Sequence, residues 1–401
     1  MPMFLRKLKH SLYLSLMKTL AGLGPGASHR AFVGSGSSRE LCNHILRTGA
    51  KKILIVTDKP LRDLGVVDRA IAALLESGIE LVYYDGVLPD PTYDQVAAGA
   101  AAAKAQGTEV ILAIGGGSAI DAAKIIAASA TSTESPKDWV GFGKVKHQVL
   151  KLYVMPTTSG TGSEATMGAV ISDSETHQKG VISGGTLLPV AAALDPDLML
   201  GLPPHITAAT GMDALTHAIE AYIGVWERGT RLEDARIGVK LVFDNLATAY
   251  RDGANREARA GMAMGAYYAG LAINQVNVGN VHAIAHQLGA RYGIPHGLAN
   301  ALVLPHVLEY CHQEAAPRLA ELAVLVGLGK AGADQNQLAY QFIQAVRNLR
   351  TEVGIADHSD KLKREDFAAI AELAIVEGDG YPVPRLLEKD GILMILGKIA
   401  G

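Results

Sequence analysis

The sequence predicts a two-domain protein in which a mostly parallel α/β domain precedes an all-α domain. Three observations support this prediction. The chain has 401 residues, which exceeds the length at which one hydrophobic core stops growing. Between residues 31 and 203, short apolar runs alternate with helical periodicity, as in a Rossmann-like sheet covered by helices on both faces. From residue 204 to 401 only helical periodicity continues.

The predicted strands are apolar runs that end at turn-forming residues. They lie at 51–58, 80–87, 108–118, 150–164 and 190–198. Helices are expected between the first of them, at 67–78, 92–107 and 119–130. In the second domain the predicted helices lie at 205–224, 231–253, 255–275, 278–290, 297–310, 313–326, 335–353, 364–375 and 386–398. Breaks that contain Gly or Pro separate many of these helices.

Composition excludes several classes of protein. Hydrophobic residues make up 49% of the chain and charged residues 19%, which is typical of a well-buried globular enzyme. The net charge is −3 and the body has no dense basic patch, so nucleic acid is not an expected partner. Two cysteines, Cys42 and Cys311, are too few for a disulfide framework and suit a reducing, cytoplasmic location.

Residues 1–30 form a basic extension that differs from the rest of the chain. It contains no acidic residue, and the first in the sequence is Glu40. A signal peptide is disfavoured because Lys18 interrupts the apolar part and no cleavage site follows. A basic amphipathic helix on a membrane surface remains an alternative. We expect instead a docked or loose helix, because one short segment gives little membrane affinity.

Two loops in the α/β domain are candidates for binding phosphate. Gly115, Gly116, Gly117 and Ser118 stand between a predicted strand and a predicted helix, where backbone N–H groups and the helix dipole attract anions. The loop matches neither GxGxxG nor a P-loop, so alone it fits a tight turn equally well. The segment 157–163 also follows a strand and adds hydroxyl groups at the carboxyl edge of the sheet. Ligands of open α/β sheets bind at that edge.

Five residues of the helical domain are candidates for a metal site. Asp213 and His217 lie four residues apart, and His282 and His286 repeat this spacing before His296. Residues four apart project from one face of a helix. A lone histidine on an apolar helix is usually a hydrogen-bonded core residue. One carboxylate with several imidazoles is instead typical of a site for a first-row divalent metal.

Four segments together resemble the iron-containing, metal-dependent (group III) alcohol dehydrogenase family. They are GGGSAIDAAK (115–124), PTTSGTGSEAT (156–166), TGMDALTHAIEAY (210–222) and VHAIAHQLGARYGIPHGLANA (281–301). The resemblance implies an architecture similar to dehydroquinate synthase, with an active site in the cleft between the two domains. It also implies assembly as a dimer or a larger homo-oligomer.

The resemblance assigns roles to individual residues. Asp213, His217, His282 and His296 match the iron ligands, and His286 matches a histidine near the nicotinamide and the substrate. The expected ligands are NAD and Fe²⁺, although Zn²⁺ or another divalent metal also suits the donor set. The expected cofactor contacts are Asp58, Gly115, Gly116, Gly117, Ser118, Asp121, Thr157, Thr158, Thr161, Lys179 and Leu188.

Asp58 bears on the choice between NAD and NADP. In the family, an acid at the end of the first strand accepts hydrogen bonds from the adenosine ribose and disfavours the NADP phosphate. Two like charges 4 Å apart repel by about 4 kcal/mol at an effective dielectric of 20, and solvent reduces this. Asp58 could also serve only to cap the following helix or to pair with Lys59.

The expected reaction is hydride transfer between NAD and a small primary alcohol or diol. The sequence departs from many relatives before His282, where Ile273, Asn277 and Asn280 stand in an unusually polar segment. These asparagines either face the substrate or bridge helices. A polyol oxidoreductase similar to glycerol dehydrogenase, a lyase of the same fold that uses NAD, and a non-enzymatic binding scaffold are the alternatives.

Overall fold

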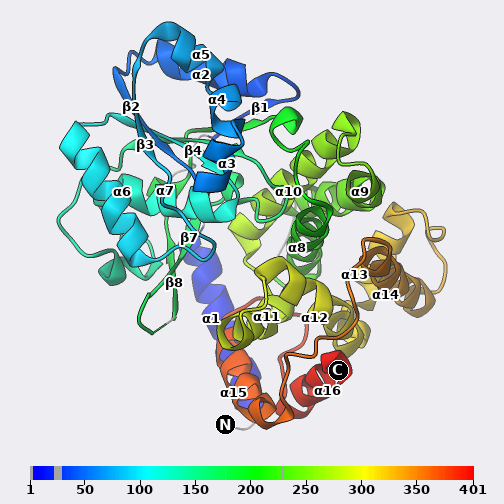
Figure 1. Ribbon diagram of the computed structural model, residues 1–401. Coiled ribbons are helices and arrows are strands. Elements are labelled where there is room, and N and C mark those ends of the chain that lie inside the picture. The colour runs from blue at the N-terminus through cyan, green and yellow to red at the C-terminus, as the bar shows by residue number, and fades with distance from the viewer. Residues whose placement is uncertain (1–2, 22–28, 177, 227–229) are drawn as a thin grey trace. The chain divides into compact units, whose positions relative to one another are not determined.

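The computed structural model describes residues 3–21, 29–176, 178–226 and 230–401 (Figure 1). The chain forms two compact units, an α/β unit (26–202 and 253–270) and a helical unit (1–25, 203–252 and 271–401). Two segments therefore differ from the division expected from the sequence. Residues 1–25 cluster with the helical unit, and residues 253–270 cluster with the α/β unit.

The α/β unit is built on a six-stranded sheet with the order β1-β9-β6-β4-β2-β3. All of its pairings are parallel, as the alternating pattern predicted. The strands are β1 (Arg30–Val33), β2 (Lys52–Val56), β3 (Glu80–Tyr84), β4 (Val110–Gly115), β6 (Lys151–Pro156) and β9 (Ala191–Leu194). Helices separate most of them: α2 (Ser37–Arg47), α3 (Lys59–Asp63), α4 (Val66–Ala70), α5 (Ala72–Ser77), α6 (Tyr93–Gln106) and α7 (Gly117–Ser129).

The central strands are apolar throughout because both faces of the sheet are buried. Along β2, Leu54 and Val56 pack into one core cluster, and Ile53 and Ile55 pack into another on the opposite face. Successive side chains of a strand point to opposite faces, so a continuous apolar run fills both cores.

The order of the strands reverses between β2 and β4. From β2 the chain moves outward to β3, returns to β4 on the other side of β2, and continues to β6. Loops at the carboxyl ends of strands diverge at such a reversal, which creates the usual ligand site of an open α/β sheet. Asp58 follows β2, and Gly116 and Gly117 follow β4. The fold therefore places these predicted residues at the reversal.

A second sheet in this unit was not anticipated from the sequence. It has the order β5-β8-β7 and consists of β5 (Gly141–Phe142), β8 (Lys179–Ser183) and β7 (Gly168–Ser172). β7 and β8 pair antiparallel. The single helix expected at 67–78 is also divided, into α4 and α5, at Ile71.

The helical unit follows the predicted periodicity closely. Its helices after residue 203 are α8 (Pro204–Ile223), α9 (Thr230–Arg251), α11 (Asn280–Tyr292), α12 (His296–Tyr310), α13 (His312–Leu325), α14 (Gln335–Glu352), α15 (Phe367–Gly378) and α16 (Lys389–Ile399). α10 (Arg256–Val276) contributes residues to both units.

The basic N-terminal segment forms α1 (Met3–Ala21), which packs on the helical unit. Arg6 Nε donates to Asp379 at 2.7 Å, and its Nη1 donates to the carbonyl of Leu387 at 2.6 Å. His10 Nε2 donates to the carbonyl of Tyr381 at 2.7 Å. Among the residues that the structure describes, no helix combines the length and apolar character needed to cross a bilayer.

Candidate metal centre and nucleotide-binding edge

Two of the candidate ligands lie on α8. Pro204 stands in the first turn of this helix, where its missing N–H has no intrahelical role. Asp213 and His217 follow on one buried face, with 2% and 5% of their surface exposed. Burying a carboxylate without a partner is costly, so this pair requires compensating positive charge or hydrogen-bond donors.

The other two ligand candidates come from the start of α11 and the start of α12. His282 lies in the first turn of α11. Gly293 ends that helix in the left-handed conformation, with φ +62°, and α12 begins at His296. At Gly297, a Cβ atom would lie 2.3 Å from the carbonyl oxygen of Ala209 on α8. The glycine therefore lets α12 approach α8 closely enough to bring His296 to Asp213.

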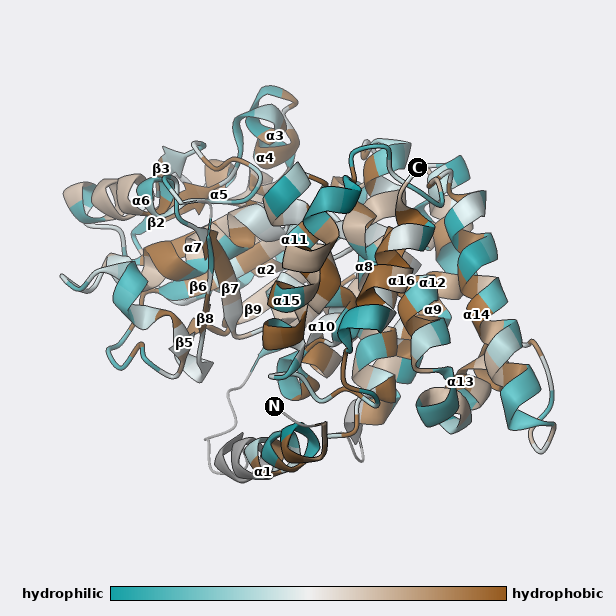
Figure 2. Ribbon diagram, turned by 90° about the horizontal axis from the view of Figure 1, so that it is seen from below, coloured by the Kyte–Doolittle hydropathy of each residue, from teal (hydrophilic) through white to brown (hydrophobic). Residues whose placement is uncertain are grey.

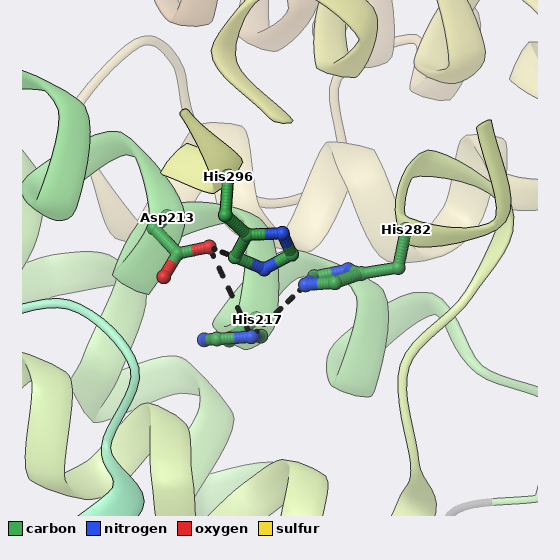
Figure 3. Close-up of side chains that lie close together, drawn as sticks. All are labelled: Asp213, His217, His282 and His296. Carbon is green, nitrogen blue, oxygen red and sulfur yellow. Dashed lines mark hydrogen bonds and ion pairs between the residues drawn. The ribbon is translucent and has the colours of Figure 1, made fainter. Parts of the chain in front are cut away.

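The four side chains converge on one point (Figure 3). One potential ligand atom from each of Asp213, His217, His282 and His296 lies within 4.8 Å of all the others. The Nε2 atoms of His217 and His282 are 3.0 Å apart, and Asp213 Oδ1 lies 3.5 Å from His296 Nε2. The two shorter separations fit ligands of a single cation, since ligand atoms about 2.0–2.2 Å from a common metal lie within ~4.4 Å of each other. The widest separation, up to 4.8 Å, is slightly larger than this limit.

Glu220 orients the ring of His282 through the nitrogen that does not face the cluster. Its carboxylate accepts hydrogen bonds from His282 Nδ1 at 2.6 Å, from Val281 N at 2.6 Å and from Gly279 N at 2.8 Å. A carboxylate only accepts, so Nδ1 of His282 carries the proton and Nε2 presents its lone pair to the cluster. Burial raises the pKa of Glu220 to about 7, while the two backbone donors act in the opposite direction. A cation in the cluster would further favour the ionised form.

The charge state of the histidines also suits metal binding. Burial lowers the pKa of His282 and of His296 well below the ordinary value, and the neighbouring imidazoles contribute to both shifts. Both rings are consequently neutral at neutral pH, the form in which an imidazole donates to a metal. Asn300 Nδ2 donates to Asp213 Oδ1 at 2.7 Å and so fixes the orientation of this carboxylate.

His286 lies beside the cluster but is held by a different set of residues. Its ring stacks on His296, with centroids 5.3 Å apart. Its Nδ1 donates to Glu377 on α15 at 2.5 Å. Glu377 also accepts hydrogen bonds from Tyr381 at 2.7 Å and from Gln287 at 2.8 Å. The ring is partly exposed, unlike those of His217 and His282.

The two asparagines before and within α11 form hydrogen bonds with the backbone, one of them local and one long-range. Asn277, with φ +81°, accepts a hydrogen bond from Val278 N at 2.9 Å. Asn280 is buried and donates to the carbonyl of Arg385 at 2.8 Å. These contacts correspond to the alternative in which the asparagines shape and bridge the helical segments.

In the α/β unit, the ends of β2, β4 and β6 bring the predicted nucleotide contacts together. A Cβ atom at Gly116 would lie 3.2 Å from Thr158 Oγ1, and one at Gly117 would lie 2.5 Å from Thr161 Cγ2. Thr157 N donates to the carbonyl of Gly115 at 3.0 Å. Glycine is therefore required for the close packing of the two loops. The N-terminus of α7 emerges between them and provides free backbone N–H groups.

Asp58 faces the same edge of the sheet. Its Oδ1 accepts a hydrogen bond from Leu61 N at 2.9 Å and so caps α3. Its Oδ2 lies 3.8 Å from the position of a Cβ atom on Gly115. Lys59 pairs with Asp63 rather than with Asp58. Asp58 therefore caps α3, and the cap uses one of its two carboxylate oxygens.

The remaining predicted cofactor residues have other surroundings. Lys179 Nζ pairs with Asp90 at 2.7 Å. Asp121 accepts hydrogen bonds from Ser163 Oγ and from Val170 N, and it lies 3.8 Å from the buried Lys124. These contacts tie α7 to the segment that leads into β7. Ser118 lies in the first turn of α7, and Leu188 is half-buried after a short 3₁₀ helix.

Dinucleotides bind at the carboxyl edge of a parallel sheet, and one carboxylate with three imidazoles can hold a cation that polarises a substrate oxygen. Both features together favour the class of metal-dependent dehydrogenases.

Comparison with known proteins identifies the family within this class. Residues 28–196 match the family "Iron-containing alcohol dehydrogenase", and residues 207–400 match "Fe-containing alcohol dehydrogenase family, C-terminal". Alcohol dehydrogenase 4 of Saccharomyces cerevisiae is 37% identical over 92% of this chain and 96% of its own length. The chain belongs to the iron-containing alcohol dehydrogenase family and is an oxidoreductase, as the four sequence segments indicated.

Solved structures agree with this assignment. A 1,3-propanediol oxidoreductase has a TM-score of 0.89 and 37% identity, with 92% of this chain and 97% of that chain covered. The sulfoacetaldehyde reductase of Bifidobacterium kashiwanohense, solved in complex with NAD+, has a TM-score of 0.85 and 28% identity, with 94% and 98% covered. Both share the two-part fold described above.

Proposed function

We propose that this protein interconverts a small primary alcohol or diol and the corresponding aldehyde, with NAD(H) as hydride carrier and a divalent metal held by Asp213, His217, His282 and His296. The observation that carries the proposal is the approach of these four ligand atoms to within 4.8 Å of one another. Fe²⁺ is the metal that the family suggests. Zn²⁺ competes for the same donors because its intrinsic affinity is higher.

The residues of the cluster would have different roles in binding the metal. When bound, the cation would act as a Lewis acid toward the substrate oxygen. Asp213 would supply the negative charge, and the three imidazoles would supply ring-nitrogen lone pairs. Glu220 fixes the orientation of His282 from outside the cluster. Asn300 lies against the ligand atoms themselves, since its Nδ2 is 2.7 Å from Asp213 Oδ1 and 3.1 Å from His282 Nε2.

His286 is the proposed proton carrier. Because Glu377 engages its Nδ1, its Nε2 is oriented as the atom that exchanges a proton with the substrate hydroxyl or carbonyl. Its partial exposure provides a route for the proton to solvent. Glu377 acts as a positioning residue because it touches His286 rather than the reacting atoms.

Glu377→Gln should lower kcat by roughly tenfold to hundredfold and leave the metal content unchanged, because only the hold on a general acid–base is weakened. The pH dependence of kcat should shift as well, which a purely structural role would not produce. The matched control is Glu372→Gln on the same helix, whose side chain pairs with the exposed Lys389. Loss of metal from Glu377→Gln, or unchanged kcat and pH profile, would contradict the assignment.

We infer that NAD binds along the carboxyl ends of β2, β4 and β6. The backbone N–H groups of Gly116, Gly117 and the first turn of α7 suit the pyrophosphate, and Thr157 and Thr158 add donors from the adjacent loop. Asp58 is the proposed partner of the adenosine ribose. The NAD+ complex of the related sulfoacetaldehyde reductase supports this cofactor.

Asp58→Gly should raise kcat/KM with NADP relative to NAD by roughly tenfold to hundredfold, because the 2′-phosphate no longer meets a carboxylate. The substitution also removes the cap of α3, so Asp58→Asn serves as the matched variant, which keeps an acceptor for Leu61 N without the charge. Both variants should shift toward NADP in steady-state assays. Equal losses with both cofactors would assign Asp58 to capping alone.

The substrate class can be tested with 1-alkanols against 1,2- and 1,3-diols. We propose activity on small alcohols of both kinds, since Asn277 and Asn280 are engaged in hydrogen bonds with the backbone. We further propose a cytoplasmic location and assembly as a dimer or a larger homo-oligomer, in accord with the low cysteine content and the family.

A further inference from the structure

The side of α1 that faces the protein is polar, and the side that faces outward carries exposed apolar residues. Its inward side includes Arg6 and His10, which form hydrogen bonds with Asp379, Leu387 and Tyr381. Its outward side is mainly apolar, with the exposed Ser11 and Ser15 beside the apolar residues. The exposed fractions are 75% for Phe4, 48% for Leu5, 48% for Leu8 and 65% for Leu12. A helix docked on a protein normally buries its apolar stripe, and here polar side chains make the docking contacts.

The exposed apolar residues form one stripe with a lysine on each side. Leu5, Leu8 and Leu12 are three and four residues apart, so they follow one face of the helix. At about 100° per residue, Lys7 and Lys9 lie on opposite flanks of Leu8. Both lysines are exposed, and Figure 2 shows hydrophobic and hydrophilic positions along α1.

We propose that this outward face of α1, defined by Phe4, Leu5, Leu8, Leu12, Lys7 and Lys9, docks the protein on an anionic lipid surface. An apolar stripe with flanking cations is the arrangement of helices that lie in the plane of a bilayer interface. The apolar side chains enter the boundary of headgroups and acyl chains, and the lysines reach anionic headgroups. The first 39 residues contain no acidic side chain that would oppose this attraction.

The arrangement favours lipid over another protein as the occupant. A standard protein interface uses about 20–30 residues on each side. The outward face of α1 offers far fewer, and long lysines at its edges suit a fluid charged surface better than a fixed partner. The polar inward contacts of Arg6 and His10 hold the helix on the body while its apolar stripe faces outward. The sequence alone disfavoured this partner because one short segment gives little membrane affinity. The structure adds which side of the helix is exposed.

The test is sedimentation of the full-length protein with vesicles of phosphatidylcholine alone and with 30–40% phosphatidylglycerol (about the anionic content that gives a strong surface potential). Wild-type protein should bind the anionic vesicles. Leu8→Glu/Leu12→Glu should bind them at least about tenfold more weakly. The variant lacks two leucines that would enter the bilayer, and it adds two negative charges that anionic headgroups repel. The matched control is Leu64→Glu/Leu75→Glu, which introduces the same changes at exposed leucines of the α/β unit and should bind as wild type does.

A second arm tests the charges. Lys7→Gln/Lys9→Gln should weaken binding to anionic vesicles by about thirtyfold, at ~1 kcal/mol for each lysine. Thermal denaturation and alcohol oxidation should be unaffected in all of these variants, because every substituted side chain is exposed. Absence of wild-type binding would overturn the proposal. So would equal weakening in the control, or a change of oligomeric mass in Leu8→Glu/Leu12→Glu without a change in lipid binding, which would make the face a contact between copies.

Discussion

His217→Ala should abolish metal retention and turnover together. The substitution removes one of three imidazoles from the cluster and leaves Asp213 with fewer partners in a buried position. A Lewis acid contributes several kcal/mol to such a reaction, so turnover should fall by roughly a thousandfold or more. The measurements are metal content after anaerobic dialysis and the rate of NADH formation.

The control for this prediction is His286→Ala, a neighbouring histidine whose ring contacts the cluster but is held by Glu377. This variant should retain the metal and lose activity to a smaller extent. Circular dichroism should show native helix content in both proteins. If both variants lost the metal equally, the distinction between ligand and proton carrier would be wrong.

Glu220→Gln should weaken metal binding by about tenfold to hundredfold without removing any ligand. The carboxylate accepts from three donors, His282 Nδ1, Val281 N and Gly279 N. An amide brings an N–H₂ group that cannot accept, so at least one of these donors loses its partner and His282 loses its orientation. Competition with a fluorescent chelator measures the change in affinity.

Activity distinguishes this outcome from general loss of structure. At saturating metal, Glu220→Gln should recover most of the wild-type turnover, whereas His217→Ala should not. Glu377→Gln serves as the comparison because it alters a partly exposed carboxylate–histidine pair that contains no proposed metal ligand. Unchanged metal affinity in Glu220→Gln would show that the backbone alone positions His282.

Local spacing in the sequence indicated the turn-spaced pairs of the cluster, and the family resemblance indicated which four residues act together. Turn-spaced pairs on apolar helices, such as Asp213 with His217, fix which side chains share a face before any tertiary contact is known. The supporting residues carried a weaker signal of the same kind. Glu220 lies one turn beyond His217, and Asn300 lies one turn beyond His296. Both could have been found by extending the helical spacing, and both were missed.

Other features had no local signal. Glu377 reaches His286 from a helix 91 residues further along the chain, so only the packing of α15 on α11 reveals the pair. The second sheet was missed for a related reason: β5 has two residues, and β7 and β8 are short strands within a loop-rich segment. The division at Ile71 interrupts a segment whose periodicity reads as one continuous helix.

Which side of α1 is exposed also could not be predicted from local sequence. Periodicity indicated an amphipathic helix, and the natural expectation is that its apolar stripe faces the protein. Arg6 reverses this, because its ion pair with Asp379 and its hydrogen bond to the carbonyl of Leu387 hold the polar side inward.

An anomalous difference map at the iron absorption edge, from crystals grown and soaked anaerobically with Fe²⁺, tests the central claim most directly. One peak per chain is expected, about 2.0–2.2 Å from an oxygen of Asp213 and from one ring nitrogen each of His217, His282 and His296. A fully active crystal preparation with no peak between these four side chains, or with its peak elsewhere, would contradict the account.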